Sequence, residues 1–94
     1  MITVDFSKRK NTPLYEFLYE SIKDAVLKGE LTADEKLPSQ RHLSLHLGIS
    51  IITVRAAYER LIDEGFIYSI EKKGFYITKL SIKKVFLDTQ KIKK

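Results

Sequence analysis

The feature that most restricts the fold of this chain is a three-residue step, Gly48-Ile49-Ser50, between two short stretches of helical apolar spacing. Before the step, Leu43 and Leu47 recur four residues apart, as on one face of a helix. After it, four apolar residues follow the i, i+3, i+4, i+7 pattern of a buried helix face: Val54, Ala57, Tyr58 and Leu61. Two short helices joined by so tight a step predict a helix-turn-helix unit.

Capping residues set the expected limits of these two helices. Ser39 follows Leu37-Pro38 and predicts the N-cap of the earlier helix, which Gly48 ends. Ser50 predicts the N-cap of the later helix, which we expect to run to about Glu64 and to be closed by Gly65.

A longer helix is expected upstream of this unit. Thr12 predicts its N-cap, Pro13 its first helical residue and Gly29 its end. Its apolar residues recur at helical spacing: Leu14, Leu18, Ile22, Ala25 and Val26.

A β-hairpin is predicted after the third helix. Residues 66–70 and 75–78 alternate as strands do, and the turn 71–74 ends with Gly74, which tolerates a positive φ. Three helices followed by a hairpin predict a mostly α fold with a small β-hairpin, the winged helix-turn-helix. We assign it to residues 12–78, with 1–11 as an extended lead-in and 79–94 as a basic tail or linker.

The charge of the chain is unevenly placed. The net charge is +5, and residues 79–94 account for all of it, with six lysines against Asp88. Residues 1–78 are neutral, with eleven basic and eleven acidic side chains. Within them, the stretch 36–58 has no acid and carries Lys36, Arg41 and Arg55. A segment free of negative charge is what a surface that meets phosphates requires.

Several classes of protein are excluded by what the sequence lacks. It has no apolar run near the roughly 18 residues that span a bilayer, and its first ten residues do not form a signal peptide. The absence of cysteine fits a reducing cytoplasm, where we expect the protein. His42 and His46 lie four residues apart but lack a third soft ligand, so we expect no metal site. Because no nucleophile–base pair, carboxylate dyad or phosphate-binding glycine loop is present, we expect no enzyme and no catalytic residue.

Residues 12–78 resemble the GntR family of bacterial transcription regulators. The following segments and residues carry the resemblance: Pro13-Leu14-Tyr15, Gly29-Glu30-Leu31, Lys36-Leu37-Pro38-Ser39-Gln40-Arg41, Leu47-Gly48-Ile49-Ser50, Thr53-Val54-Arg55, Tyr58, Leu61, Glu64-Gly65 and Gly74. Two of its stretches, 12–16 and 50–54, look like the MocR subgroup, in which this domain precedes an aminotransferase-like domain that binds pyridoxal phosphate.

The resemblance implies a sequence-specific DNA-binding domain of a cytoplasmic bacterial transcription factor that binds double-stranded DNA, as a homodimer, with no membrane partner. The effector, the operator and the sense of regulation stay open. No cofactor is expected in this chain, because pyridoxal phosphate would need the absent downstream effector domain, and the resemblance makes residues 79–94 the start of the linker to that domain. Ile51 stands where many members of the family have a base-contacting arginine, which leaves the operator sequence undetermined.

The resemblance also implies which residues contact DNA, with a helix at about residues 50–64 in the major groove and a wing at about 71–74 near the minor groove or backbone. The expected DNA-binding residues are Ser39, Gln40, Arg41, Ser50, Ile51, Ile52, Thr53, Arg55, Lys72, Lys73 and Gly74.

Several of these roles have a simpler alternative. Ser39 could serve only as a cap, Arg55 could pair with Glu59, and the two wing lysines could aid solubility alone. The whole domain could also be a winged helix that contacts proteins without reading DNA.

Overall fold

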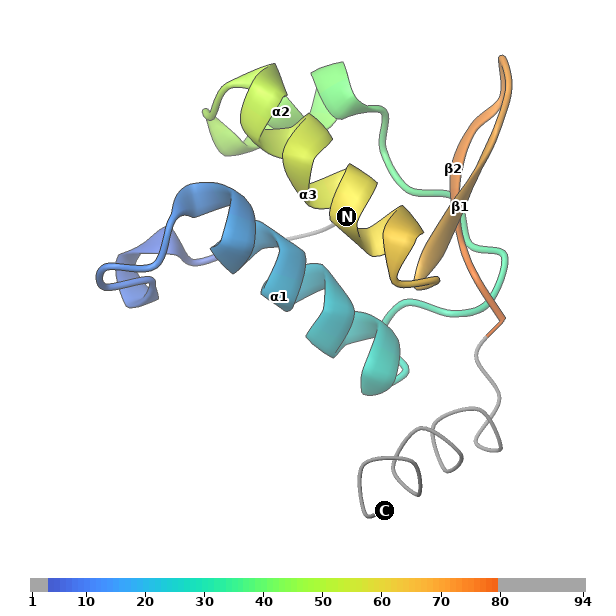
Figure 1. Cartoon of the computed structure of the whole chain (residues 1–94), viewed down its shortest axis with the longest axis horizontal. Helices are drawn as coiled ribbons and strands as arrows, with labels where there is room; N and C mark the ends of the chain where they lie inside the picture. Colours follow the sequence, from blue (N-terminus) through green and yellow to red (C-terminus); the bar gives the residue numbers. More distant parts are fainter. Residues whose placement is uncertain (1–3, 80–94) are drawn as a thin grey trace.

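The computed structural model describes residues 4–79 of the chain (Figure 1). It contains a 3-10 turn, three α-helices and a two-stranded antiparallel sheet, which confirms the predicted winged helix-turn-helix. The elements are η1 (Phe6–Lys8), α1 (Leu14–Leu27), α2 (Gln40–Leu47), α3 (Ile51–Asp63), β1 (Ile67–Ile70) and β2 (Gly74–Ile77). None of the helices in this part of the chain is long and apolar enough to cross a membrane.

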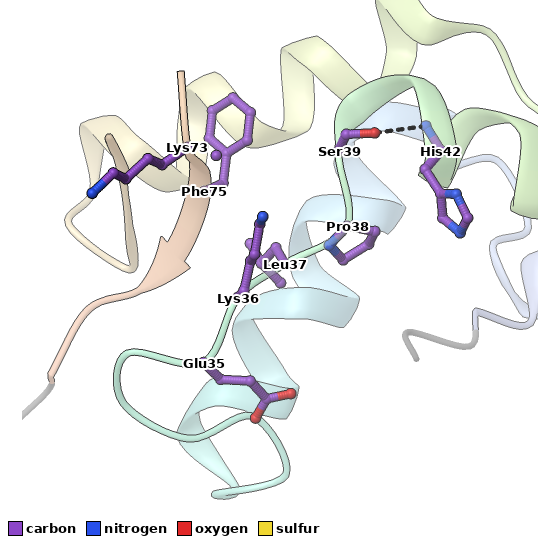
Figure 2. A pocket seen from close by; sticks show the side chains of 9 residues that line it. Glu35, Lys36, Leu37, Pro38, Ser39, His42, Lys73 and Phe75 are labelled. Carbon is purple, nitrogen blue, oxygen red and sulfur yellow. Dashed lines mark hydrogen bonds between the residues drawn. The ribbon is translucent and has the colours of Figure 1, made fainter. Parts of the chain in front are cut away.

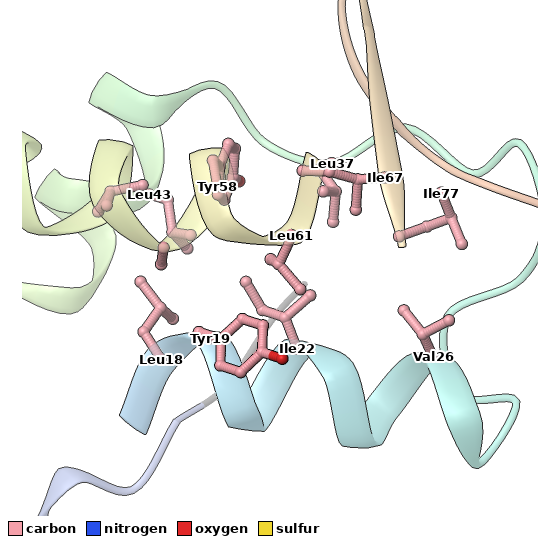
Figure 3. Close-up of a cluster of buried hydrophobic side chains, with 12 residues drawn as sticks. Leu18, Tyr19, Ile22, Val26, Leu37, Leu43, Tyr58, Leu61, Ile67 and Ile77 are labelled. Atoms are coloured by element: carbon pink, nitrogen blue, oxygen red, sulfur yellow. The ribbon is translucent and has the colours of Figure 1, made fainter. Parts of the chain in front are cut away.

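Helix α3 lies at the centre of the packing. It contacts α1 on one side, α2 on another and β1 at its end. The core consists of twelve apolar side chains, most of them drawn in Figure 3: Leu18, Tyr19, Ile22, Val26, Leu37, Leu43, Val54, Ala57, Tyr58, Leu61, Ile67 and Ile77. The α3 residues among them are the four of the predicted stripe, so the helical spacing located the buried face correctly.

The caps of α2 and α3 are those predicted. The Ser39 side chain accepts a hydrogen bond from the His42 N–H at 3.0 Å. The Ser50 side chain accepts one from the Thr53 N–H at 3.1 Å. Gly48, with φ of 70°, ends α2 in the left-handed conformation that glycine adopts without strain.

Two expectations at the N-terminus were wrong. The N-cap of α1 is Pro13, with no side-chain cap, so Thr12 lies one residue too early to serve. The lead-in is not fully extended, because Asp5 caps the 3-10 turn through the Ser7 N–H. This turn is held to α1 by the rings of Phe6 and Phe17, whose centroids lie 5.9 Å apart.

The hairpin is one residue shorter at each outer end than expected, and its turn is tighter. Strand β1 pairs with β2 in antiparallel register, with Ile67 opposite Ile77 and Ile70 opposite Gly74. The turn comprises residues 71–73, so Gly74 is already the first residue of β2.

The connector between α1 and α2 pairs with β2, which the sequence analysis did not anticipate. Lys36 forms a β-bridge with Tyr76. On either side of it, the Leu37 N–H donates to the Phe75 carbonyl at 2.8 Å and the Ile77 N–H donates to the Glu35 carbonyl at 2.9 Å. The connector therefore fixes the position of the wing relative to the start of α2.

Candidate nucleic-acid interface

The start of α2 presents a cation on a well-fixed helix end. Arg41 is exposed in the first turn, and Gln40 beside it is half-buried. The Tyr58 hydroxyl of α3 donates a hydrogen bond to the Pro38 carbonyl at 2.7 Å, immediately before the Ser39 cap. Free N–H groups at a helix start, together with an arginine, suit a phosphate oxygen.

The step between α2 and α3 is rigidly bonded. The Ile49 N–H donates to the Ser44 carbonyl at 3.0 Å, and the buried Ser44 hydroxyl donates to the Arg41 carbonyl at 2.8 Å. At the start of α3, the hydroxyls of Ser50 and Thr53 lie 2.8 Å apart in a hydrogen bond. The two hydroxyls of this cap are therefore hydrogen-bonded to each other. Ser50 is nevertheless exposed, and Thr53 is half-buried.

The first turns of α3 expose one aliphatic side chain and one cation. Ile52 is 69% exposed, whereas Val54, two residues on, is fully buried. Arg55 is exposed on the next turn, and Ile51 is half-buried. The alternative pairing of Arg55 with Glu59 is not formed: the ion pairs among residues 4–79 are those of Arg60 with Glu16 and Glu64.

The wing tip presents two lysines on a strained turn. Lys72 and Lys73 are both exposed. Lys72 has a φ of 66°, a left-handed conformation that costs a lysine free energy, and the Lys73 N–H closes the turn on the Ile70 carbonyl at 2.9 Å. Gly74 follows with a φ of 127°, which only glycine adopts readily.

A hollow of about 630 Å³ lies between the wing and the start of α2 (Figure 2). Nine residues line it: Glu35, Lys36, Leu37, Pro38, Ser39, His42, Lys73, Gly74 and Phe75. The aromatic ring of Phe75 also packs edge-on against Tyr58, with ring centroids 4.9 Å apart. The wing and the start of α2 thus meet at this hollow, and Phe75 in its lining contacts Tyr58 of α3.

The predicted site residues fall into three adjoining groups, on α2, on α3 and on the wing. The α2 group and the α3 group adjoin through the helix-turn-helix step, and the wing residues adjoin α2 across the hollow. Whether these residues contact DNA stays a prediction. Lys36, in the hollow, was absent from the predicted set, although the acid-free stretch that contains it was the available signal.

Metal-ligating side chains do not gather in the part of the chain that the structure describes. Among residues 4–79, no group of three or more His, Asp or Glu is arranged to hold a metal ion. The predicted basic tail lies outside the described residues beyond Lys79.

A family model described as "Bacterial regulatory proteins, gntR family" matches residues 14–77. Among curated relatives, the chain is 40% identical over 75 residues to the uncharacterized HTH-type transcriptional regulator YhdI of Bacillus subtilis, covering 80% of this chain and 16% of YhdI. It is 34% identical over 76 residues to the HTH-type transcriptional repressor NagR of the same organism, covering 81% of this chain and 31% of NagR. The chain therefore spans less than a third of each of these two relatives.

One weaker likeness hints at the predicted MocR subgroup. The chain is 34% identical over 70 residues to the probable rhizopine catabolism regulatory protein MocR of Rhizobium meliloti, covering 74% of this chain and 14% of that protein. The subgroup stays a prediction.

Solved structures agree on the fold. A protein described as a transcriptional antiterminator from Listeria monocytogenes superposes with a TM-score of 0.76 at 31% identity, covering 99% of this chain and 72% of that one. The DNA-binding domain of AraR, crystallised in complex with operator ORR3, superposes with a TM-score of 0.66 at 29% identity, covering 70% of this chain and 80% of that one. The family model, the curated relatives and the shared fold agree, and the chain belongs to the GntR family of bacterial regulatory proteins.

Proposed function

We propose that this chain binds double-stranded DNA in a sequence-specific manner as the DNA-binding domain of a transcription regulator. In this proposal α3 enters the major groove, its first turns contact base edges, and the wing lies near the minor groove or the backbone. The observation that carries the proposal is the exposed face of the first two turns of α3, where Ile52 and Arg55 project from a helix whose opposite face is buried.

The roles of the side chains follow from their chemistry. Arg41, at the start of α2, contacts a backbone phosphate and fixes the register of the domain on DNA. Arg55 reaches a guanine edge, which an arginine can bind through two hydrogen bonds. Lys72 and Lys73 neutralise phosphates beside the minor groove. The proposed contact surface is completed by the other predicted DNA-binding residues: Ser39, Gln40, Ser50, Ile51, Thr53 and Gly74.

The same family relationship supports several wider proposals. The protein acts in the bacterial cytoplasm, carries no catalytic activity in this domain and binds its operator as a homodimer. The domain needs no cofactor of its own, and any pyridoxal phosphate would belong to another domain.

One experiment tests the central proposal. Affinity for a random duplex and for a duplex enriched by selection is measured at increasing salt. A DNA-binding domain loses affinity steeply with salt on both duplexes and prefers the enriched one. A lack of salt-dependent binding, or equal affinity for both duplexes, would overturn sequence-specific recognition.

The second candidate is a winged helix that contacts another protein. The neutrality of residues 1–78 favours it, because a typical DNA-binding domain carries net positive charge. The acid-free stretch 36–58 opposes it, since a neutral domain can still present one basic face. The salt titration separates the two, because a module of this second kind would not bind random duplexes.

A further inference from the structure

The side chain of Lys36 lies in the hollow between the wing and α2. Figure 2 shows it rising from the connector into the space between Phe75 and the Pro38-Ser39 segment. Its stem crosses the wing at Gly74: a methyl group at position 74 would lie 3.1 Å from Cε of Lys36 and 3.9 Å from its Nζ. A glycine at this position therefore lets the lysine pass close to the wing backbone.

The backbone of Lys36 is held in place while its side chain stays accessible. Its bridge to Tyr76 and the adjacent hydrogen bond from Leu37 to Phe75 anchor the connector to β2. Lys36 is nevertheless exposed to solvent. A cation with a fixed base and an accessible end loses less conformational entropy when it binds a ligand than one on a mobile loop.

The lining of the hollow has a net positive charge, because it contains the two cations Lys36 and Lys73 and one acid. Glu35 is the single acid among the nine lining residues, and its carboxylate accepts hydrogen bonds from the Thr32 N–H at 3.0 Å and the Thr32 hydroxyl at 3.1 Å. Figure 2 shows the Glu35 side chain directed away from the Lys36 ammonium. Lys73 adds a second cation to the lining.

We propose that this hollow receives one phosphodiester group of the DNA backbone and that Lys36 is the cation that binds it. The inference rests on the proposed DNA-binding function and adds a contact to it. The start of α2 lines the hollow through Ser39 and the wing lines it through Lys73, so a DNA strand that contacts both elements passes over the hollow that holds Lys36. The contact contributes affinity and carries no base information.

The test compares two neutral variants, Lys36→Gln and Lys36→Met, with the unmodified chain on random duplexes. The methionine variant keeps an apolar stem against Gly74. It therefore provides the test if the glutamine variant disturbs the structure of the wing. Loss of one phosphate contact lowers the slope of log affinity against log salt by about 0.9. The advantage of the unmodified chain over either variant should therefore shrink about 3.5-fold between 50 and 200 mM salt, equally for every duplex sequence.

Two further variants serve as controls. Lys36→Arg keeps the charge and should keep the slope. Lys28→Gln removes the same charge at the C-terminal end of α1, which Figure 1 shows on the side of the molecule away from α2 and the wing tip, and should leave the slope nearly unchanged.

The possible outcomes separate this inference from the proposed function. Salt-dependent binding of the unmodified chain with unchanged slopes for both neutral Lys36 variants would overturn the inference and leave the proposed function standing. Equal losses for Lys28→Gln and Lys36→Gln would also overturn it, because net charge would then explain both. If the unmodified chain shows no salt-dependent binding, both proposals fail.

Discussion

The hydroxyl of Tyr58 on α3 donates a hydrogen bond to the carbonyl oxygen of Pro38, 2.7 Å away in the connector to α2. The same ring packs edge-on against Phe75 of β2. One buried side chain thus joins the three parts of the candidate interface: the start of α2, helix α3 and the wing. Burial raises the pKa of Tyr58, so its hydroxyl stays a protonated donor at neutral pH.

The Tyr58→Phe variant should keep the fold and lose stability. Its ring still fills the core, but the Pro38 carbonyl loses its partner, which costs about 1–2 kcal/mol in the free energy of unfolding. Urea denaturation measures the change. Tyr15→Phe, at an exposed position of α1, is the matched control and should change stability little. Equal stability of Tyr58→Phe and the unmodified chain would show that the hydrogen bond contributes nothing net.

Acid should weaken the contact between α1 and α3 through Glu64. The Tyr19 hydroxyl donates a hydrogen bond to the Glu64 carboxylate, and Arg60 pairs with the same group at 3.3 Å. Both interactions lower the pKa of Glu64, the first more strongly, below its usual 4.5. A carboxylate whose pKa is lower in the folded state than in the unfolded state stabilises the fold at pH values above its unfolded-state pKa. That stabilisation is lost as the pH falls through the folded-state pKa.

The Tyr19→Phe variant tests this linkage. It should be less stable than the unmodified chain by about 1 kcal/mol at neutral pH, and the difference should narrow as the pH falls below 4.5, the usual pKa of glutamate. Burial and the bond to Glu64 raise the pKa of Tyr19 to about 12, so the contribution should also disappear as the pH rises from 10 through that value. Thermal melts across the pH range measure the loss of this stability difference at acid and at alkaline pH. A difference that is constant from acid to alkaline pH would exclude the hydrogen bond as its source.

The helices were predictable because their signals are local. The caps at Ser39 and Ser50 each form a hydrogen bond to a residue three positions later in the sequence. The four apolar residues predicted for α3 are the four that are buried. The error at Thr12 is also local: Pro13 supplies the non-helical residue that precedes α1, and helix boundaries depend on backbone angles that residue type alone does not fix.

The non-local features could not be predicted in this way. The bridge of Lys36 to Tyr76 joins residues forty positions apart through a single pair, too short to leave an alternating pattern in the connector. The bond from Tyr58 to Pro38 likewise needs the helices to be placed before it can be recognised. For the candidate interface, residue spacing located the helix-turn-helix step and the wing. The position of Lys36 beside Gly74 depends on how the connector packs on the wing, which only the folded structure shows.

Arg41 and Arg55 should differ in how their loss changes DNA binding. Arg41→Ala should weaken binding to all duplexes alike and lower the salt slope by about 1, as the loss of a phosphate contact does. Arg55→Ala should in addition relax base preference at one position, where a two-hydrogen-bond contact to guanine gives about 1–3 kcal/mol of discrimination. Competition between the selected duplex and its single-base variants measures both effects. Both side chains are exposed, so thermal stability should be unchanged, and unchanged affinity in both variants would remove these contacts from the proposal.

Ile52 should give the domain a preference for thymine. Its side chain is 69% exposed on the N-terminal turn of α3, opposite the buried Val54, so no packing in the free domain accounts for it. Single exposed apolar residues are common on protein surfaces, and that simpler explanation predicts no effect on DNA binding. On a helix in the major groove, however, an isoleucine can meet the methyl group of thymine.

A matched pair of variants separates these two explanations of Ile52. In a selection from randomised duplexes, the unmodified chain should enrich thymine at one position, and Ile52→Ala should abolish that enrichment at a cost of about 1 kcal/mol on the selected site. Leu45→Ala removes an equally exposed aliphatic side chain from α2, 76% exposed, and should leave the base preference intact. If the thymine preference survives Ile52→Ala, or disappears equally in Leu45→Ala, another part of the interface must be its source. The reason is that only a side chain in contact with the thymine methyl group can change the base preference at that one position when it is shortened.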